Sequence, residues 1–329
     1  IAGGGLIGGS LACALGGTGL RVAAVESLAP EARAEPTYDE RVIALSWGSR
    51  RILDGLGLWP GIAPEAAPIA QVHISVRGHF GFTRLDHREL GVPALGYVVP
   101  ARVLGGAIDS ALVATAGVER LCPARVLDQR LDADGVLVRV QDADGERSIH
   151  ARLLIVADGS GSRLGEALGV TLEERPYAHD AVITTLTPDR PLAGVAFERF
   201  TETGPLALLP MTGGRYSVVW TCREEETAEI LALSDHAFLA RLQGRFGYRL
   251  GGLTQPAPRR AYPLKLALVR DPVRERAVLV GNAAHTLHPV AGQGFNLGLR
   301  DVAALVEVLA QAAAHGDDPG AAHVLADYT

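Results

Sequence analysis

The chain opens with IAGGGLIGGSLACALGGTGLRVAAVES, residues 1–27, a stretch that predicts an apolar strand, a glycine-rich turn, a helix and a second strand. Gly3, Gly5 and Gly8 form the pattern G-x-G-x-x-G. In such a turn the first glycine permits the tight bend, the second lets the backbone approach a pyrophosphate, and the third lets helix and strand pack closely. Glu26 ends the second strand about 20 residues further on, where an acid accepts hydrogen bonds from a ribose 2′-OH. The stretch therefore predicts a Rossmann-like α/β domain that binds a dinucleotide.

Composition limits the class of protein. The chain has 329 residues, enough for two domains, and its 48% apolar and 21% charged residues are typical of a globular protein. A formal net charge of −6 argues against nucleic acid as a partner, because binding phosphates requires a clustered basic face. Cys13, Cys122 and Cys222 form no CxxC pair, which favours a cytoplasmic location over a disulfide framework. No apolar run reaches the ~18 residues of a spanning helix, and we expect further sequence beyond residues 1 and 329.

The segments after the glycine turn alternate between strand and helix patterns. Apolar residues between 43 and 56 predict an amphipathic helix, and residues 71–86 alternate as in a β-hairpin. Residues 96–117 predict a strand and a helix, and residues 124–157 predict a β-meander that ends in a buried strand. Together they indicate a parallel sheet with a β-meander beside it.

The residue pattern changes near residue 180, where alternation typical of strands begins. Alternating Thr, Val, Phe and Trp up to residue 222 predict an antiparallel sheet with one covered face, and residues 224–247 predict one or two amphipathic helices. We therefore expect an α/β nucleotide domain plus an α+β substrate domain built on an antiparallel sheet. The predicted nucleotide domain comprises residues 1–70, 98–178 and 266–329, and the predicted substrate domain comprises residues 71–97 and 179–265.

A second glycine-rich stretch, GNAAHTLHPVAGQGFNLGLRD, occupies residues 281–301. His285 and His288 are only two potential metal ligands, without a third at a supporting spacing, so we expect no metal site. Gly292-Gln293-Gly294 instead stands at the predicted start of a long helix, whose free N–H groups favour a nearby negative charge such as that of a reduced flavin. Asp158-Gly159 follows the buried strand of the meander, at the sheet edge where open α/β folds bind ligands.

These motifs, in this order and spacing, resemble the FAD-dependent aromatic hydroxylases, the class A flavoprotein monooxygenases, and within them the ubiquinone-biosynthesis hydroxylases of the 2-octaprenyl-6-methoxyphenol hydroxylase type. The resemblance covers nearly the whole chain and is most specific in HPVAGQGFNLGLRD and GPLALLPMTGGRYSVVW. It implies a para-hydroxybenzoate-hydroxylase-like architecture. Two positions depart from the family pattern: Asn282 stands where Asp is usual, and Gly165 stands where the Asp-Gly motif normally continues to an Arg.

The resemblance also implies roles for individual residues. It places the FAD pyrophosphate on the first glycine turn, the adenosine ribose on Glu26, and two arginines near the pyrophosphate and the ribityl chain. It places Asp158 against FAD and the pyridine nucleotide, and the second glycine stretch beside the isoalloxazine ring. The implied FAD-binding residues are Gly3, Gly5, Gly8, Glu26, Arg41, Arg102, Asp158, Gly281, Asn282, Pro289, Gly292, Gln293, Gly294 and Asn296.

The implied activity is that of an NAD(P)H:oxygen oxidoreductase. NADH or NADPH reduces FAD, O2 adds to give a C4a-hydroperoxide, and its distal oxygen attacks a polyprenylated phenol. The flavin carries the chemistry, so no side-chain nucleophile is required; Pro289 and His288 are expected beside it, and His288 and Tyr216 are candidates for the base that acts on the phenol. Such a substrate implies peripheral contact with the inner membrane or a quinone-synthesis complex, and homo-oligomerisation is left open.

We expect the substrate between the antiparallel sheet and the flavin, with Leu208, Pro210 and Trp220 in the wall; these side chains fit the core of the sheet equally well. Three other functions remain open. A class A monooxygenase acting on a soluble aromatic shares every flavin motif, a flavin reductase consumes no oxygen, and a scaffold subunit of a quinone-synthesis complex holds no FAD.

Overall fold

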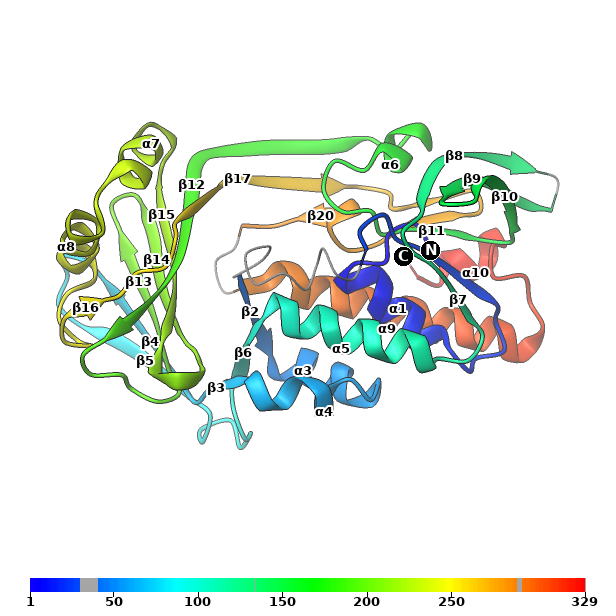
Figure 1. The fold of residues 1–329 in the computed structure, drawn as a ribbon. Coiled ribbons are helices and arrows are strands. Elements are labelled where there is room, and N and C mark those ends of the chain that lie inside the picture. Colours follow the sequence, from blue (N-terminus) through cyan, green and yellow to red (C-terminus); the bar gives the residue numbers. More distant parts are fainter. Residues whose placement is uncertain (30–40, 133, 289–291, 329) are drawn as a thin grey trace.

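The computed structural model describes residues 1–29, 41–132, 134–288 and 292–328. It confirms the predicted fold class: an α/β part with a parallel sheet and a β-meander adjoins a large, mainly antiparallel sheet covered by two helices (Figure 1). The two parts are connected by the long strands β12 (Leu172–Pro188) and β17 (Arg260–Val269), which run side by side between them.

The parallel sheet forms around the first glycine turn. Strand β1 (Val22–Val25) pairs in parallel with β7 (Val118–Leu121), and β11 (Leu154–Val156) pairs in parallel with β19 (Ala277–Leu279). Ala2 bridges both Val25 and Val156 in parallel, so the strand expected at residues 1–3 is reduced to one bridging residue. The short β18 (Val273–Arg274) adds to β19 in antiparallel orientation.

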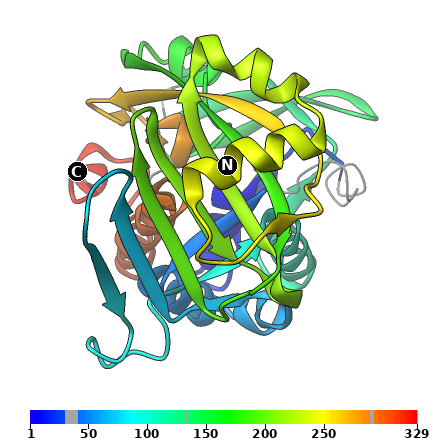
Figure 2. The same ribbon diagram turned by 90° about the vertical axis from the view of Figure 1, so that its left-hand side faces the viewer.

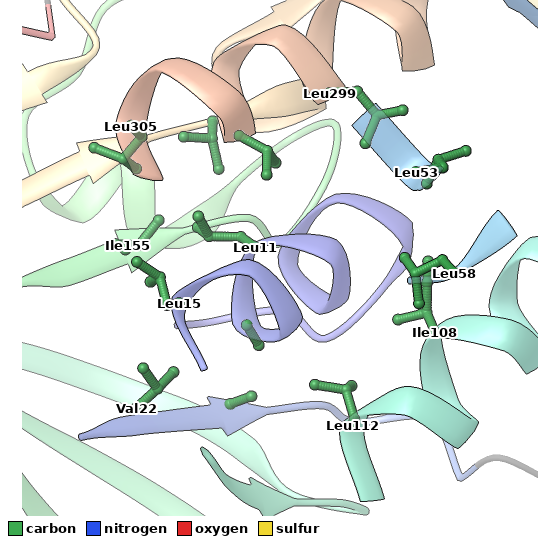
Figure 3. Packing of buried hydrophobic residues seen from close by; sticks show 14 of the residues in the cluster. Leu11, Leu15, Val22, Leu53, Leu58, Ile108, Leu112, Ile155, Leu299 and Leu305 are labelled. Carbon is green, nitrogen blue, oxygen red and sulfur yellow. The ribbon is translucent and has the colours of Figure 1, made fainter. Parts of the chain in front are cut away.

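Successive side chains of these strands point to opposite faces of the sheet, and each face packs in a separate hydrophobic core. Val22, Ile155 and Val278 belong to one buried cluster with residues of helices α1 (Leu6–Leu15), α5 (Ala101–Ala114) and α9 (Gln293–His315). Figure 3 shows Val22 and Ile155 beside Leu11 and Leu15 of α1. Leu154, Val156, Ala277 and Leu279 alternate with Ile155 and Val278 along β11 and β19 and face the antiparallel meander β8 (Arg125–Asp132), β9 (Gly135–Asp142) and β10 (Gly145–Ala151). Both faces of the sheet are therefore buried, as is usual for parallel strands.

The helix predicted across residues 43–56 is partly wrong. Its first half is strand β2 (Val42–Ser46), which pairs with β6 (Gly96–Pro100), and β6 in turn pairs with β3 (Ala67–Ile69). Helix α3 (Trp47–Gly55) begins only after Ser46, whose side chain accepts a hydrogen bond from the Ser49 N–H. Pairing with a distant strand thus overrides a local spacing that also fits a helix.

The large sheet has the strand order β20-β17-β12-β15-β14-β13-β4-β5, with β16 beside β12. Its β4–β5 hairpin is as predicted, although β4 and β13 pair in parallel. Helices α7 (Glu224–Ala232) and α8 (Asp235–Phe246) lie across its outer face (Figure 2). The strands not yet bounded are β4 (Gln71–Val76), β5 (Phe82–Asp86), β13 (Val195–Thr201), β14 (Gly204–Pro210), β15 (Tyr216–Arg223), β16 (Leu253–Thr254) and β20 (His285–Thr286).

The remaining elements are short connections: α4 (Trp59–Ile62), α6 (Arg163–Ala167), α10 (Ala322–Ala326), and the 3-10 turns η1 (Ala63–Glu65), η2 (Thr212–Gly214) and η3 (Gly281–Ala283). The pairing of β12 with β17 shifts register between Pro176 and Asp180, where Ala178 has φ 54°. This irregularity falls at the boundary that we propose between the nucleotide domain and the substrate domain.

Candidate active site

A single cavity of about 1640 Å³ brings the two glycine turns together. Gly3 and Gly5 line it from the first turn, and Gly292 and Gly294 line it from the second. The inner face of the large sheet forms another part of the wall, and residues of β8 and of the segment that follows β11 also line the cavity. Ligand cavities for small molecules usually measure about 300–1000 Å³, so this one has room for a cofactor together with a second molecule.

The three glycines of the first turn have distinct roles. A Cβ on Gly3, whose φ is +102°, would lie 2.3 Å from the Ala157 carbonyl oxygen, and a Cβ on Gly8 would lie 1.8 Å from the Gly3 carbonyl oxygen. A Cβ on Gly5 would meet no atom within 4 Å. Gly3 and Gly8 therefore permit close packing within the chain, whereas the open side of Gly5 faces the cavity.

The first turn fits the pyrophosphate of a dinucleotide. Helix α1 has no side-chain cap and no acidic residue in its first turn, so its first N–H groups are available to an anion. Glu26 lines the cavity at the end of β1, where its Oε2 accepts from the Gly4 N–H at 2.9 Å and its Oε1 accepts from the Leu28 N–H at 2.8 Å. These bonds hold the carboxylate in place and leave lone pairs for a ribose hydroxyl.

The second glycine turn is attached to strand β2 by Asn296. The Asn296 side chain, 2% exposed, accepts from the Ser46 N–H at 2.8 Å and donates to the carbonyls of Ala44 and Gly292 at 2.8 and 2.6 Å. Asn296 is not among the residues that line the cavity. It positions Gly292, which begins α9 with φ +60°, so that the start of this 23-residue helix faces the cavity.

Asp301 holds the Gly281-Asn282 turn from helix α9. Its Oδ2 accepts from the Gly281 N–H at 3.0 Å and lies 2.6 Å from His285 Nε2. Asn282 lines the cavity, whereas Gly281 does not. Across the described residues no group of three or more His, Cys, Asp or Glu side chains is arranged to hold a metal.

The remaining predicted cofactor residues divide between the cavity and the surface. Asp158 and Arg41 line the cavity. Burial raises the pKa of Asp158, although its hydrogen bond with Ser162 opposes the shift. The Arg102 side chain forms an ion pair with Glu65 on the exposed surface instead. Like Arg102, the predicted residues Gly8 and Gln293 do not line the cavity. Pro289 lies outside the described residues.

The predicted substrate wall requires correction. Leu208, Pro210 and Trp220 are buried and do not line the cavity. Leu208 and Trp220, each 0% exposed, pack in the core under α7 and α8, where the Trp220 ring lies 5.8 Å from that of Phe238. The cavity is lined by the residues one position along each strand, among them Ala207, Leu209 and Val219. Successive side chains of a strand point to opposite faces. Both faces of β14 are apolar, whereas the cavity face of β15 carries Ser217 and Thr221 on either side of Val219.

The two candidate bases differ in their surroundings. The Tyr216 hydroxyl donates to the Leu192 and Val195 carbonyls at 2.7 and 3.1 Å, and burial raises its pKa to about 12. Tyr216 is thus a core residue, which corrects that expectation. His288 lines the cavity, and its pKa is lowered by burial and, to a smaller extent, by His179. Both effects favour the neutral imidazole of His288.

Sequence reasoning missed Glu198 on β13. This residue lines the cavity, and burial raises the pKa of its carboxyl to about 7. The only signal in the sequence is an acid in an apolar alternation, between Ala196 and Phe200.

Comparison with known proteins supports the cofactor assignment. The family model of the FAD binding domain matches residues 1–322. The ubiquinone hydroxylase UbiL of Rhodospirillum rubrum is 40% identical over 328 residues, which span all of this chain and 76% of that protein. The 3-demethoxyubiquinol 3-hydroxylase of Escherichia coli is 32% identical over 319 residues, 96% of this chain and 80% of that protein.

Solved structures show the same fold. The p-nitrophenol 4-monooxygenase PnpA from Pseudomonas putida superposes with a TM-score of 0.80 at 22% identity, covering all of this chain and 82% of that one. PqsL from P. aeruginosa in complex with 2-aminobenzoylacetate gives 0.83 at 23% identity, covering all of this chain and 89% of that one. The family match, the glycine turns and their shared cavity establish that the chain belongs to the FAD-dependent class A flavoprotein hydroxylases.

Proposed function

We propose that this protein hydroxylates the aromatic ring of a polyprenylated phenol in ubiquinone biosynthesis. One observation carries the proposal: a single large cavity runs from the FAD-binding turns to a mainly apolar wall on the large sheet. The similarity to the ubiquinone hydroxylase UbiL and to the 3-demethoxyubiquinol 3-hydroxylase supports this substrate class. A class A monooxygenase acting on a soluble aromatic is the alternative, since it shares the flavin site and differs in this wall.

The residues of the chain divide the work of binding. We assign the FAD pyrophosphate to Gly5 and the first turn of α1, the ribose to Glu26, and the flavin ring to the start of α9, because all of them line the cavity. Bound FAD, once reduced by NADH or NADPH, supplies the activation of O2 for oxygen insertion. The apolar side chains of Ile74, Leu209 and Val219 disfavour water in the part of the cavity that they line.

The activity test compares substrates with and without a prenyl tail. Purified holoenzyme with NAD(P)H and isotopically labelled O2 should yield a prenylated phenol that carries one labelled oxygen. Each buried methylene contributes about 0.8 kcal/mol, so the prenylated phenol should have at least a tenfold lower KM than its tail-free analogue. Equal KM values would favour the soluble-aromatic alternative, and substrate turnover without oxygen uptake would indicate a reductase.

We also propose that the β4–β5 edge of the sheet contacts the membrane. Phe80, Phe82 and Leu85 are 110%, 56% and 48% exposed at this edge. Leu85 also lines the cavity, whereas the Phe82 ring lies on the other face of the strand, 4.8 Å from the ring of His73. Exposed apolar side chains gathered at one edge of the sheet, next to the mouth of an apolar cavity, fit a lipid surface. Among the described residues no helix is long and apolar enough to span a bilayer.

Flotation with liposomes tests this contact. The wild-type protein should float with vesicles that contain a quinone precursor, and the double variant Phe80→Ser, Phe82→Ser should float less. Val113→Ser is the matched control, because Val113 is 79% exposed on α5, outside this edge. Equal flotation of the double variant and the control would contradict the proposal.

A further inference from the structure

Glu198 is an acid in an otherwise neutral wall. The strands of the large sheet contribute many side chains to the cavity, and among those described Glu198 is the only charged one. Its neighbours across the sheet are Ile74 on β4 and Ala207 on β14, and Ala207 is followed by Val219 on β15. The carboxyl therefore stands in a row of apolar side chains that face the cavity.

The carboxyl of Glu198 has no hydrogen bond or ion pair with any other described residue of the chain. Burial alone raises its pKa to about 7. Its nearest acidic neighbour along the chain, Glu202, is instead exposed and paired with Arg77. A partly buried carboxyl without a partner costs stability, which is a typical feature of a group that awaits a ligand.

The surroundings of Glu198 indicate what kind of ligand would satisfy it. Ala181, Ala196 and Ala207 also line this wall, and their small side chains leave space above the sheet for a planar ring. A carboxylate needs a donor, and the donor of the proposed substrate is its phenolic hydroxyl. An apolar ring with one hydroxyl therefore complements an apolar wall with one carboxylate.

We propose that Glu198 binds the phenolic hydroxyl of the substrate and accepts its proton as the ring is hydroxylated. The inference rests on the proposed function and names the group that recognises the substrate. The phenolic O–H bond breaks and the proton passes to a Glu198 carboxylate oxygen. The released electron pair forms a C=O bond as a ring carbon bonds to one oxygen atom derived from O2, which the reduced flavin would activate, and the O–O bond breaks. When the ring regains aromaticity by losing its C–H proton to solvent, Glu198 returns its proton to the phenolic oxygen.

The pKa of the carboxyl suits this role. A general base works best when its pKa lies near the working pH, whereas a phenol has a pKa near 10, so the proton moves only as the ring is attacked. From β4 and β14 the cavity-facing neighbours of Glu198 are not titratable. The titratable groups elsewhere in the cavity, none of which contributes to this pKa shift, are Glu26, Arg41, Arg125, Asp128, Asp158, Arg163, Tyr262 and His288.

The test compares a phenol with its methyl ether as ligands of the holoenzyme. Binding is followed by the change in the flavin spectrum in wild type, Glu198→Gln and Glu198→Ala, with Glu202→Gln as the matched control. In wild type and in the control, methylation should weaken binding about tenfold or more, and the phenol should bind more tightly above pH 7 than below it. Glu198→Ala should bind the phenol and its methyl ether with nearly equal affinity. In both Glu198 variants the affinity for the phenol should no longer change with pH near 7.

Turnover gives a second measurement. Both Glu198 variants should lose about 100-fold or more in kcat, because neither accepts a proton, while FAD content stays normal and thermal unfolding occurs at no lower temperature than in wild type. If Glu198→Ala still distinguishes the phenol from its ether, or keeps the wild-type pH profile, the inference is wrong. If wild type prefers a tail-free phenol, the proposed substrate class fails while the role of Glu198 stands.

Discussion

Replacing single glycines of the first turn separates FAD binding from folding. Gly5 has φ −67° and ψ −162°, a conformation open to any residue, and a Cβ there meets no protein atom within 4 Å. Gly5→Val should therefore leave the unfolding free energy of the apoprotein within about 1 kcal/mol of wild type, since losing unfolded-state freedom offsets small local costs. The added side chain, however, enters the space assigned to the pyrophosphate.

The expected loss of affinity follows from the hydrogen bonds that are blocked. Each charge-assisted bond from a backbone N–H to phosphate contributes about 1.5–3 kcal/mol. Blocking two of them should lower FAD affinity by about 100-fold to 10000-fold. Fluorescence titration of the apoprotein with FAD measures the affinity, and urea unfolding of the same preparation measures stability.

Gly8→Ala is the contrasting variant. Its Cβ would lie 1.8 Å from the Gly3 carbonyl oxygen, whereas carbon and oxygen atoms normally approach to about 3.3 Å. The turn must shift by about 1.5 Å, so we expect a loss of roughly 3 kcal/mol or more in stability together with FAD binding. Wild-type FAD affinity in Gly5→Val, or apoprotein stability as low as that of Gly8→Ala, would refute the assignment of Gly5 to the cofactor.

Three further predictions concern other parts of the site. Asn296→Ala removes three hydrogen bonds of 2.6–2.8 Å and should cost about 3 kcal/mol in urea unfolding; a loss below about 1 kcal/mol would contradict its positioning role. Burial raises the pKa of the Glu198 carboxyl from its ordinary value of 4.5 to about 7 in the folded protein. The folded state therefore holds this proton more tightly, and the contribution of Glu198 to the free energy of unfolding should fall as pH rises from 4.5 to 7. Glu198→Gln has no carboxyl to ionise and lacks this penalty. The free energy of unfolding of its apoprotein, minus that of wild type, should therefore be up to about 3 kcal/mol larger at pH 8 than at pH 4. If the unfolding free energies of the two proteins depend on pH in the same way, the carboxyl is not buried. Trp220→Ala should cost about 3–5 kcal/mol yet keep FAD and the substrate KM once folded, whereas Ala207→Trp should raise the substrate KM with FAD retained; the reverse pattern would place the substrate on the outer face of the sheet.

Local sequence determined the nucleotide-binding turn and most of the elements. Glycine spacing, strand periodicity and helix starts are properties of neighbouring residues, so Gly3, Gly5 and Gly8 could be assigned to a turn without knowledge of the fold. The same holds for the β4–β5 hairpin, for the meander and for the helix that begins near Gly294. Ile43 and Leu45 were wrongly assigned to a helix because their spacing fits a helix as well as a strand. Only the pairing of β2 with β6 decides between the two.

Tertiary structure alone decided which side chains face the ligand. In β14 both faces are apolar, one under α7 and α8 and one toward the cavity, so composition could not tell Leu208 from its neighbours. In β15 the alternation of Trp220 with Ser217 and Thr221 indicates two different faces, but it does not tell which face meets the ligand. The exposed pairing of Arg102 with Glu65 and the solitary position of Glu198 likewise depend on distant segments. Sequence spacing specifies the local path of the backbone, whereas the orientation of a sheet face is set by whatever packs against it from elsewhere in the chain.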